Sequence, residues 1–123
     1  MAALVTLQAA KDHLRLSMPL GDPDEPDLQA KLDAADALVR DYVAQRRCDP
    51  DGTWAATVAS WDVTATPPVP PPPHVLNATL IVLGDLWRYR GDDLANEAPP
   101  RELGELPRAA MALLYRLRDP AVA

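Results

Sequence analysis

Apolar residues recur at helical spacing in four separate stretches of the chain. In the longest, 24–46, steps of four and three residues build a continuous stripe of Leu28, Leu32, Ala35, Val39 and Tyr42, with Leu38 and Val43 on its flanks. Three shorter stretches, 6–16, 74–90 and 107–119, repeat the pattern. In so short a chain, the long stripe fits an internal core better than a coiled-coil seam. The pattern therefore predicts a mainly α fold, a small bundle of about four helices.

The residues at the ends of these stretches have the side chains that helix ends require. Thr6 precedes the first stretch and can accept a hydrogen bond from a free amide of the first turn. Carboxylates at 22–27 and arginines at 46 and 47 match the two ends of the dipole of the second helix. Pro72 or Pro73 can open the helix over 74–90, because a missing N–H costs nothing in the first turn.

The section between the second and third long helices, 48–73, has a different composition. Its first part, 53–66, is rich in Thr, Val and Trp with weak alternation, which favours two short strands or an extended arm. A helix over 54–60 also remains compatible with its alanines. Six prolines in 67–73 favour a stiff extended segment. We therefore expect a single domain, 1–123, with an extended or β-hairpin-like arm at 48–73 and a loop at 91–106.

Composition narrows the function classes. Apolar residues make up 48% of the 123 residues and aromatic residues only 5%, with no Phe, so the core must be aliphatic. The net charge of −6 disfavours binding to DNA phosphates by charge. Cys48 is the single cysteine and cannot form an internal disulfide. With no leader-like or membrane-spanning pattern, we expect a soluble, cytoplasmic chain.

No motif in the sequence predicts catalysis, a metal site or a cofactor. The two histidines, His13 and His74, fall in different predicted elements, without the partners that nucleophilic catalysis needs. A glycine-rich phosphate loop and zinc-ligand spacing are both missing from the sequence. Arg88 and Arg90, beside Trp87 and Tyr89, suit either stacking on bases or hydrogen bonding to the last carbonyls of a helix. We expect neither enzyme activity nor a bound cofactor.

Four stretches, in order, resemble the head–tail connector (adaptor) proteins of long-tailed phages. The opening "LVTLQAAKDHLRL" is similar to the family's Thr-Leu lead and its first helix ending in His-Leu-Arg, and "LQAKLDAADALVRDYV" to its long helix after an acidic break. The stretch "PPHVLNATLIVLGDLWRYRGD" resembles its proline-led helix with an aromatic-x-x-Arg ending. The closing "LPRAAMALLYRLRD" resembles its Leu-Leu-x-x-x-Arg helix.

The resemblance implies a structural virion protein. Such proteins form a ring beneath the portal, expected to be twelvefold to match it, and extend the DNA channel. They also dock the next neck protein, a stopper or tail terminator, or the tail itself. The chain would then lie in the virion neck after assembly in the host cytoplasm, with DNA passing through the lumen unbound. The alternative is a small helical binding or regulatory module, antitoxin-like or a nucleic-acid adaptor.

We predict a set of residues at subunit or partner interfaces. For Trp54 and Trp61 the reason is size: two large aromatic side chains lie in a segment too short to build its own core, so we expect them to be buried against another chain. The complete set of candidate interface residues is Trp54, Trp61, Val63, Arg88, Arg90, Tyr115 and Arg118.

Overall fold

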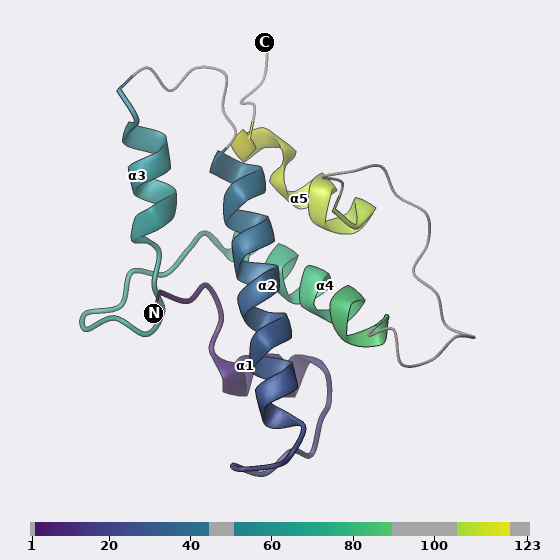
Figure 1. Ribbon diagram of the computed structural model, residues 1–123. Coiled ribbons are helices and arrows are strands. Elements are labelled where there is room, and N and C mark those ends of the chain that lie inside the picture. Colours follow the sequence, from purple (N-terminus) through teal and green to yellow (C-terminus); the bar gives the residue numbers. More distant parts are fainter. Residues whose placement is uncertain (1, 45–50, 90–105, 119–123) are drawn as a thin grey trace.

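The computed structural model describes residues 2–44, 51–89 and 106–118, and in these ranges it consists of five helices (Figure 1). The helices are α1 (Leu7–His13), α2 (Glu25–Ala44), α3 (Thr53–Ser60), α4 (Pro73–Arg88) and α5 (Arg108–Arg118). The mainly α bundle predicted from the apolar pattern is confirmed, with one helix more than the four expected. The described residues include no helix that is both long and apolar enough to cross a membrane.

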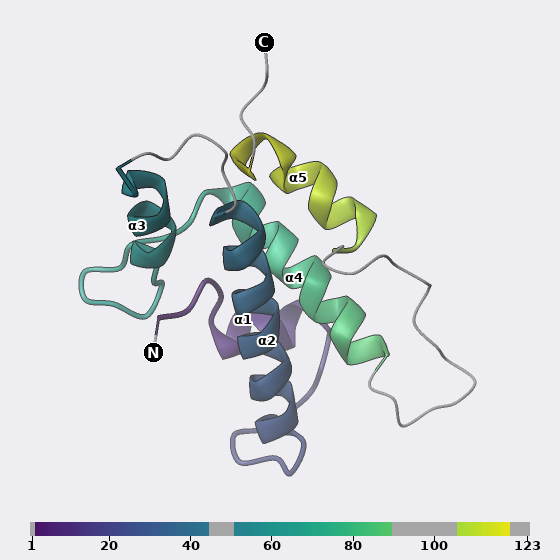
Figure 2. The same cartoon turned by 45° about the horizontal axis from the view of Figure 1, so that its top comes forward.

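The three helices α2, α4 and α5 contact one another and form the centre of the bundle. The short α1 packs against α2 and α4, near the end of the molecule where α2 begins (Figure 2). By contrast, α3 contacts α2 alone among the described helices, and it lies on the side of α2 away from α5 in both views. The fold is therefore a compact group of four helices with α3 docked on its flank.

The core follows the predicted stripes, with one correction on α2. Its buried residues are Leu28, Leu32, Ala35, Val39 and Val43. Tyr42 is only half-buried, and Leu38, expected on the flank of the stripe, is 42% exposed. The helix α4 is buried on more than one side, by Val75, Ala78, Thr79, Leu80, Val82 and Leu83.

Thr6 and the prolines at 72 and 73 close helix ends as the sequence suggests, whereas Arg46 and Arg47, expected at the end of α2, lie outside the described residues. Thr6 caps α1, its hydroxyl accepting a hydrogen bond from the amide of Ala9 at 3.1 Å. The other end of α1 closes with Arg15 in the left-handed conformation (φ 56°), so that Leu16 N–H donates to the carbonyl of Lys11. Pro72 and Pro73 begin α4.

The prediction of strands or an extended arm over 53–66 is wrong for its first half, which is the helix α3. Trp54, Val58 and Trp61 are spaced by four and three residues, so helical geometry turns all three toward the same side, and alanines fill the rest. In the described residues the only β pairing is one antiparallel bridge between Asp62 and Val69. A single bridge gives hydrogen bonds to few backbone groups, whereas a helix over 53–60 gives one to nearly every residue, so the helix is the more stable structure there.

Candidate interaction surfaces

Residues 53–73, which we call the mid-section lobe, carry a single charged residue. That residue is Asp62, whereas charged residues make up 24% of the whole chain. The lobe consists of α3 and the proline-rich segment that leads into α4, and it projects beside the bundle (Figure 1). An uncharged surface of this length is typical of the parts of a protein that contact other proteins.

Arg40 on α2 attaches the lobe to the bundle. Its guanidinium donates to the carbonyl oxygens of Val58 at 2.7 Å and Trp61 at 2.6 Å, at the end of α3. The same guanidinium pairs with Asp36 one turn earlier on α2, with 2.5 Å between Nε and the carboxylate. The other carboxylate oxygen of Asp36 accepts a hydrogen bond from the amide of Leu4 at 2.7 Å. One ion pair therefore holds α3, α2 and the segment before α1 together.

The two tryptophans lie within the protomer, which corrects the expectation that both are left for another chain. Trp61 is only 6% exposed and belongs to the core. Trp54 is half-buried, and its indole N–H donates to the carbonyl of Val43 at 2.6 Å. The two rings meet edge to face, with centroids 5.8 Å apart. Their helical spacing directs both toward α2, which supplies the core that a short segment cannot build alone.

Asp62 is bonded to its own chain rather than presented outward. One carboxylate oxygen accepts hydrogen bonds from the hydroxyl of Thr64 at 2.5 Å, the amide of Thr64 at 2.9 Å and the amide of Ala3 at 3.1 Å. These bonds lower the pKa of Asp62 below 3.8, with the Thr64 hydroxyl as the largest cause. Nearby, Val63, a predicted interface residue, is half-buried and donates its amide to the carbonyl of Ala3 at 2.8 Å.

The outer face of the lobe is therefore uncharged and partly apolar. On α3 the exposed positions are Thr53, Ala55, Ala56, Thr57, Ala59 and Ser60. On the proline-rich segment Pro67, Pro68 and Pro70 are exposed, and Val69 is 42% exposed. None of these side chains carries a charge, and the hydroxyls of Thr57 and Ser60 donate to backbone carbonyls of α3. What the surface can do is pack against another protein with little desolvation cost.

A second exposed surface lies on α5. Tyr115, another predicted interface residue, is 55% exposed, and its hydroxyl accepts a hydrogen bond from Arg116 at 3.2 Å. The guanidinium of Arg116 also lies 5.9 Å from the centre of the Tyr115 ring. Donating this hydrogen bond to the Tyr115 hydroxyl raises the pKa of Arg116, which stays charged. Arg118 ends the helix, and its side chain lies outside the described residues.

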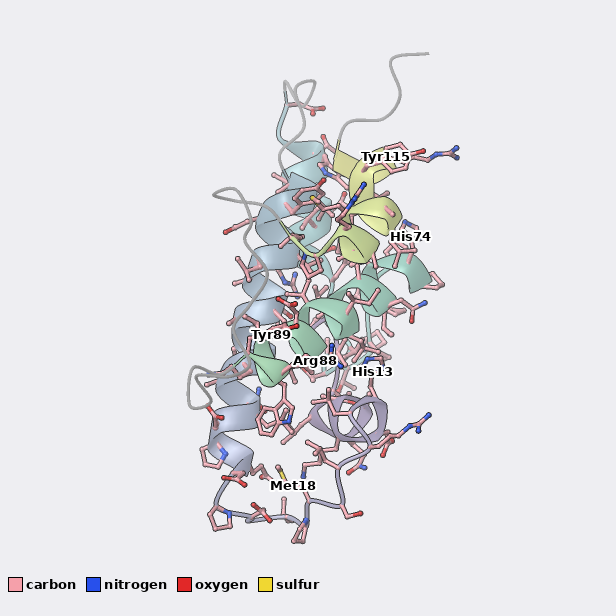
Figure 3. The ribbon with its side chains drawn as sticks, turned by 90° about the vertical axis from the view of Figure 1, so that its right-hand side faces the viewer. His13, Met18, His74, Arg88, Tyr89 and Tyr115 are labelled. Atoms are coloured by element: carbon pink, nitrogen blue, oxygen red, sulfur yellow. The ribbon has the colours of Figure 1, made fainter. Side chains whose placement is uncertain are left out.

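Between the ends of α1 and α4 lies an open cleft of about 570 Å³. His13, Arg15, Arg88 and Tyr89 line it together with Asp85 and Trp87. Figure 3 shows His13, Arg88 and Tyr89 from the side of the cleft. Arg90, predicted at the same helix end, lies outside the described residues. His74 lies in the first turn of α4 and His13 lies near the other end of that helix, so the structure does not bring the two histidines together.

The structure thus places the predicted interface residues in three different locations rather than one. The two tryptophans and Val63 support the mid-section lobe, Arg88 lines the cleft, and Tyr115 lies on α5. No group of three His, Cys, Asp or Glu side chains that could hold a metal ion occurs in the described ranges.

Sequence reasoning missed Arg40, which does most to position the lobe. Only part of its role is visible in the sequence, because Asp36 and Arg40 stand at the i, i+4 spacing of a helical ion pair. Its hydrogen bonds to Val58 and Trp61 go to backbone carbonyls, which every residue has, so the sequence does not indicate them.

Comparison of the chain with family models, with curated proteins and with solved structures finds no match.

Proposed function

We propose that this chain is a structural protein that acts by docking on other proteins, as a head–tail connector of a long-tailed phage. In this role it forms a ring beneath the portal, extends the DNA channel and docks the tail or the next neck protein. The observation that carries the proposal is the mid-section lobe, which is firmly attached to the bundle and uncharged on its outer face.

The attachment of the lobe and its outer surface support docking together. Trp61 and Arg40 fix the inner side of α3 with core packing and two hydrogen bonds from the guanidinium. A surface fixed in this way loses little conformational freedom when a partner binds, so more of the contact energy becomes affinity. The exposed prolines add to this effect, because proline has little freedom to lose.

The charge of the chain suits a channel that DNA passes through. At −6 the protein repels phosphate rather than binding it, and low affinity along the wall keeps the DNA mobile.

The first test is the genomic neighbourhood, where portal and major capsid genes upstream support a connector. The second is a binding experiment with the portal protein from the same genome, purified as rings. We expect the chain to co-sediment with the rings and to add density beneath them in negative-stain images. If the chain does not bind the portal rings and binds RNA or DNA instead, the proposal of a connector is wrong and a nucleic-acid adaptor becomes the better explanation.

A pair of variants tests the lobe itself. Pro68→Lys with Val69→Lys places two charges on the exposed lobe and should weaken portal binding at least about tenfold, because the charges must be desolvated at the interface. Ala30→Lys with Ala37→Lys adds the same charge to exposed positions on α2 and should leave binding unchanged. Circular dichroism checks that both variants keep their helices. Equal binding by the two variants would show that the lobe is not the docking surface.

A further inference from the structure

The molecule has opposite charge at its two ends. At one end lies the acidic pole, residues 20–27, the turn before α2 and the first turn of that helix. At the other end lies the basic face, the exposed side of α5, consisting of Arg108, Ala109, Ala112, Tyr115 and Arg116. Figure 3 shows Tyr115 at one end of the molecule and Met18, two residues before the acidic pole, at the other.

The acidic pole combines carboxylates with an exposed apolar side chain. Its charged residues are Asp22, Asp24, Glu25 and Asp27, and no basic residue lies within 20–27. Two of them form ion pairs with lysines outside the pole, Glu25 with Lys11 at 2.8 Å and Asp27 with Lys31 at 3.3 Å. Among these charges Leu20 is 92% exposed, the most exposed of the large apolar side chains described.

The basic face has the same composition with the charge reversed. The described α5 contains three arginines and no acidic residue, in a chain where acidic residues outnumber basic ones by 18 to 12. Tyr115, 55% exposed, supplies its apolar group, and Ala109 and Ala112 are small enough to leave room beside the ring. Exposed tyrosines flanked by arginines are common at the centres of protein interfaces.

We propose that copies of this chain meet head to tail, with the basic face of one copy on the acidic pole of the next. Each surface offers what the other lacks: carboxylates for Arg108 and Arg116, and Leu20 for the ring of Tyr115. The occupant is a second copy because the complementary surface is present on this chain, at its far end. Two different surfaces in contact form a heterologous interface, which repeats into a ring or a chain. The inference rests on the proposed function, since it names the surfaces through which ring subunits meet.

Because charge provides much of the attraction, the association should depend strongly on salt. Exposed charges interact over about 20 Å in about 20 mM salt and over only a few ångström in about 500 mM salt. Sedimentation at the low salt concentration should give a mass well above the 13.4 kDa of the monomer. At the higher concentration the association constant should fall at least about tenfold.

Charge reversal on each surface gives the decisive test. Arg108→Glu with Arg116→Glu makes both surfaces of one variant acidic. Asp22→Lys with Asp24→Lys makes both surfaces of the other basic, because the remaining Glu25 and Asp27 are paired with Lys11 and Lys31. Each variant alone should be monomeric, because like charges would then meet. An equimolar mixture of the two should associate again, because each acidic surface finds a basic one. The matched control, Asp12→Lys with Asp41→Lys, changes the net charge as much as the second variant at exposed positions outside residues 20–27 and outside α5, and it should associate like the wild type.

The inference is overturned if the wild type stays monomeric in low salt, if the charge-reversed variants still associate alone, or if their mixture does not. Circular dichroism of each variant shows that a lost association is not lost folding. A variant with Leu20→Ala and Tyr115→Ala tests the apolar part of the contact without changing any charge, and it should also weaken the association. Portal binding is measured on the same samples. If the wild type binds the portal but stays monomeric, the head-to-tail contact is wrong and the connector proposal stands. If the wild type associates in a salt-dependent way but does not bind the portal, the connector proposal is wrong and the head-to-tail contact stands.

Discussion

At the scale of single residues, Arg40 and Asp62, both half-buried, hold the mid-section lobe in place through hydrogen bonds within the chain. Arg40 supplies donors to two carbonyls at the end of α3, where the carbonyl of Val58 also accepts a longer hydrogen bond from the amide of Trp61, at 3.4 Å. Asp62 performs the complementary task, accepting from amides that the short bridge leaves without a backbone partner. Both interactions join segments that are far apart in the sequence, so each should be important for stability as well as for the shape of the lobe.

Replacing Arg40 with Met should destabilise the fold by about 2–3 kcal/mol, because it strips donors from two carbonyls and leaves Asp36 without its cation. Urea unfolding followed by circular dichroism measures the loss. Lys31→Met is the matched control, since Lys31 also pairs with an aspartate four residues away on α2, but in a more exposed position, at 3.3 Å. Its cost should stay below about 0.5 kcal/mol. Equal costs for the two variants would contradict the role given to Arg40.

Asp62 predicts a pH dependence with a definite sign. Its pKa is lowered in the folded state, so its carboxylate stabilises the fold at pH values above 3.8, and that stability is lost as the pH falls through the lowered value. Asp62→Asn keeps an oxygen acceptor in place but does not titrate. The wild type should therefore be more stable than the variant near neutral pH, and the difference should disappear in strong acid. A difference that is independent of pH would contradict the assignment.

At the scale of elements, the end of α1 is held by a residue poorly suited to its backbone conformation. Arg15 has a φ of 56°, where any side chain with a Cβ is strained and glycine is not. The hydrogen bond from Leu16 to Lys11 depends on this conformation, because it reverses the chain after the last turn.

Arg15→Gly should therefore stabilise the protein by about 1 kcal/mol, after allowing for the extra freedom of glycine in the unfolded chain. That corresponds to a rise in Tm of about 4 °C. Arg15→Ala removes the same guanidinium but keeps the strained Cβ, so it should show no such gain. Thermal unfolding of the two variants side by side separates the backbone effect from the loss of charge.

The same scale shows how far sequence reasoning reaches. The stripe of α2 was predictable because twenty residues give its period many repeats, but a heptad pattern placed Tyr42 on it, where the structure buries Val43 instead. A straight helix repeats every 3.6 residues and drifts away from a seven-residue pattern, and α2 follows the straight period. The helix α3 has only eight residues, so its apolar spacing repeats too few times to predict a helix against the strand preference of its Thr, Val and Trp residues. Its docking on α2 depends on long-range bonds from Arg40, which no local pattern contains.

At the scale of the whole molecule, stability should be unevenly distributed. The helices α2, α4 and α5 contact one another, whereas α3 contacts α2 alone among the described helices. A helix with one neighbour can open without unfolding the rest, because few buried contacts are lost when it leaves.

Hydrogen exchange should show this difference directly. Amides within α3 should exchange faster than those within α2 and α4, by local opening rather than by global unfolding. Arg40→Met should speed exchange in α3 more than in α4, because the lost bonds end on α3. Uniform protection across the helices would instead show that the lobe and the bundle unfold as one unit.

The edge-to-face contact between Trp54 and Trp61 has a practical consequence. Two indoles with centroids 5.8 Å apart couple their electronic transitions, which should give the chain a paired band in its ultraviolet dichroism. Since Trp54 belongs to α3 and Trp61 to the segment that follows it, the band reports whether that corner of the molecule is intact. The protein thus carries its own optical probe, and the packing of this corner can be followed without attaching a dye.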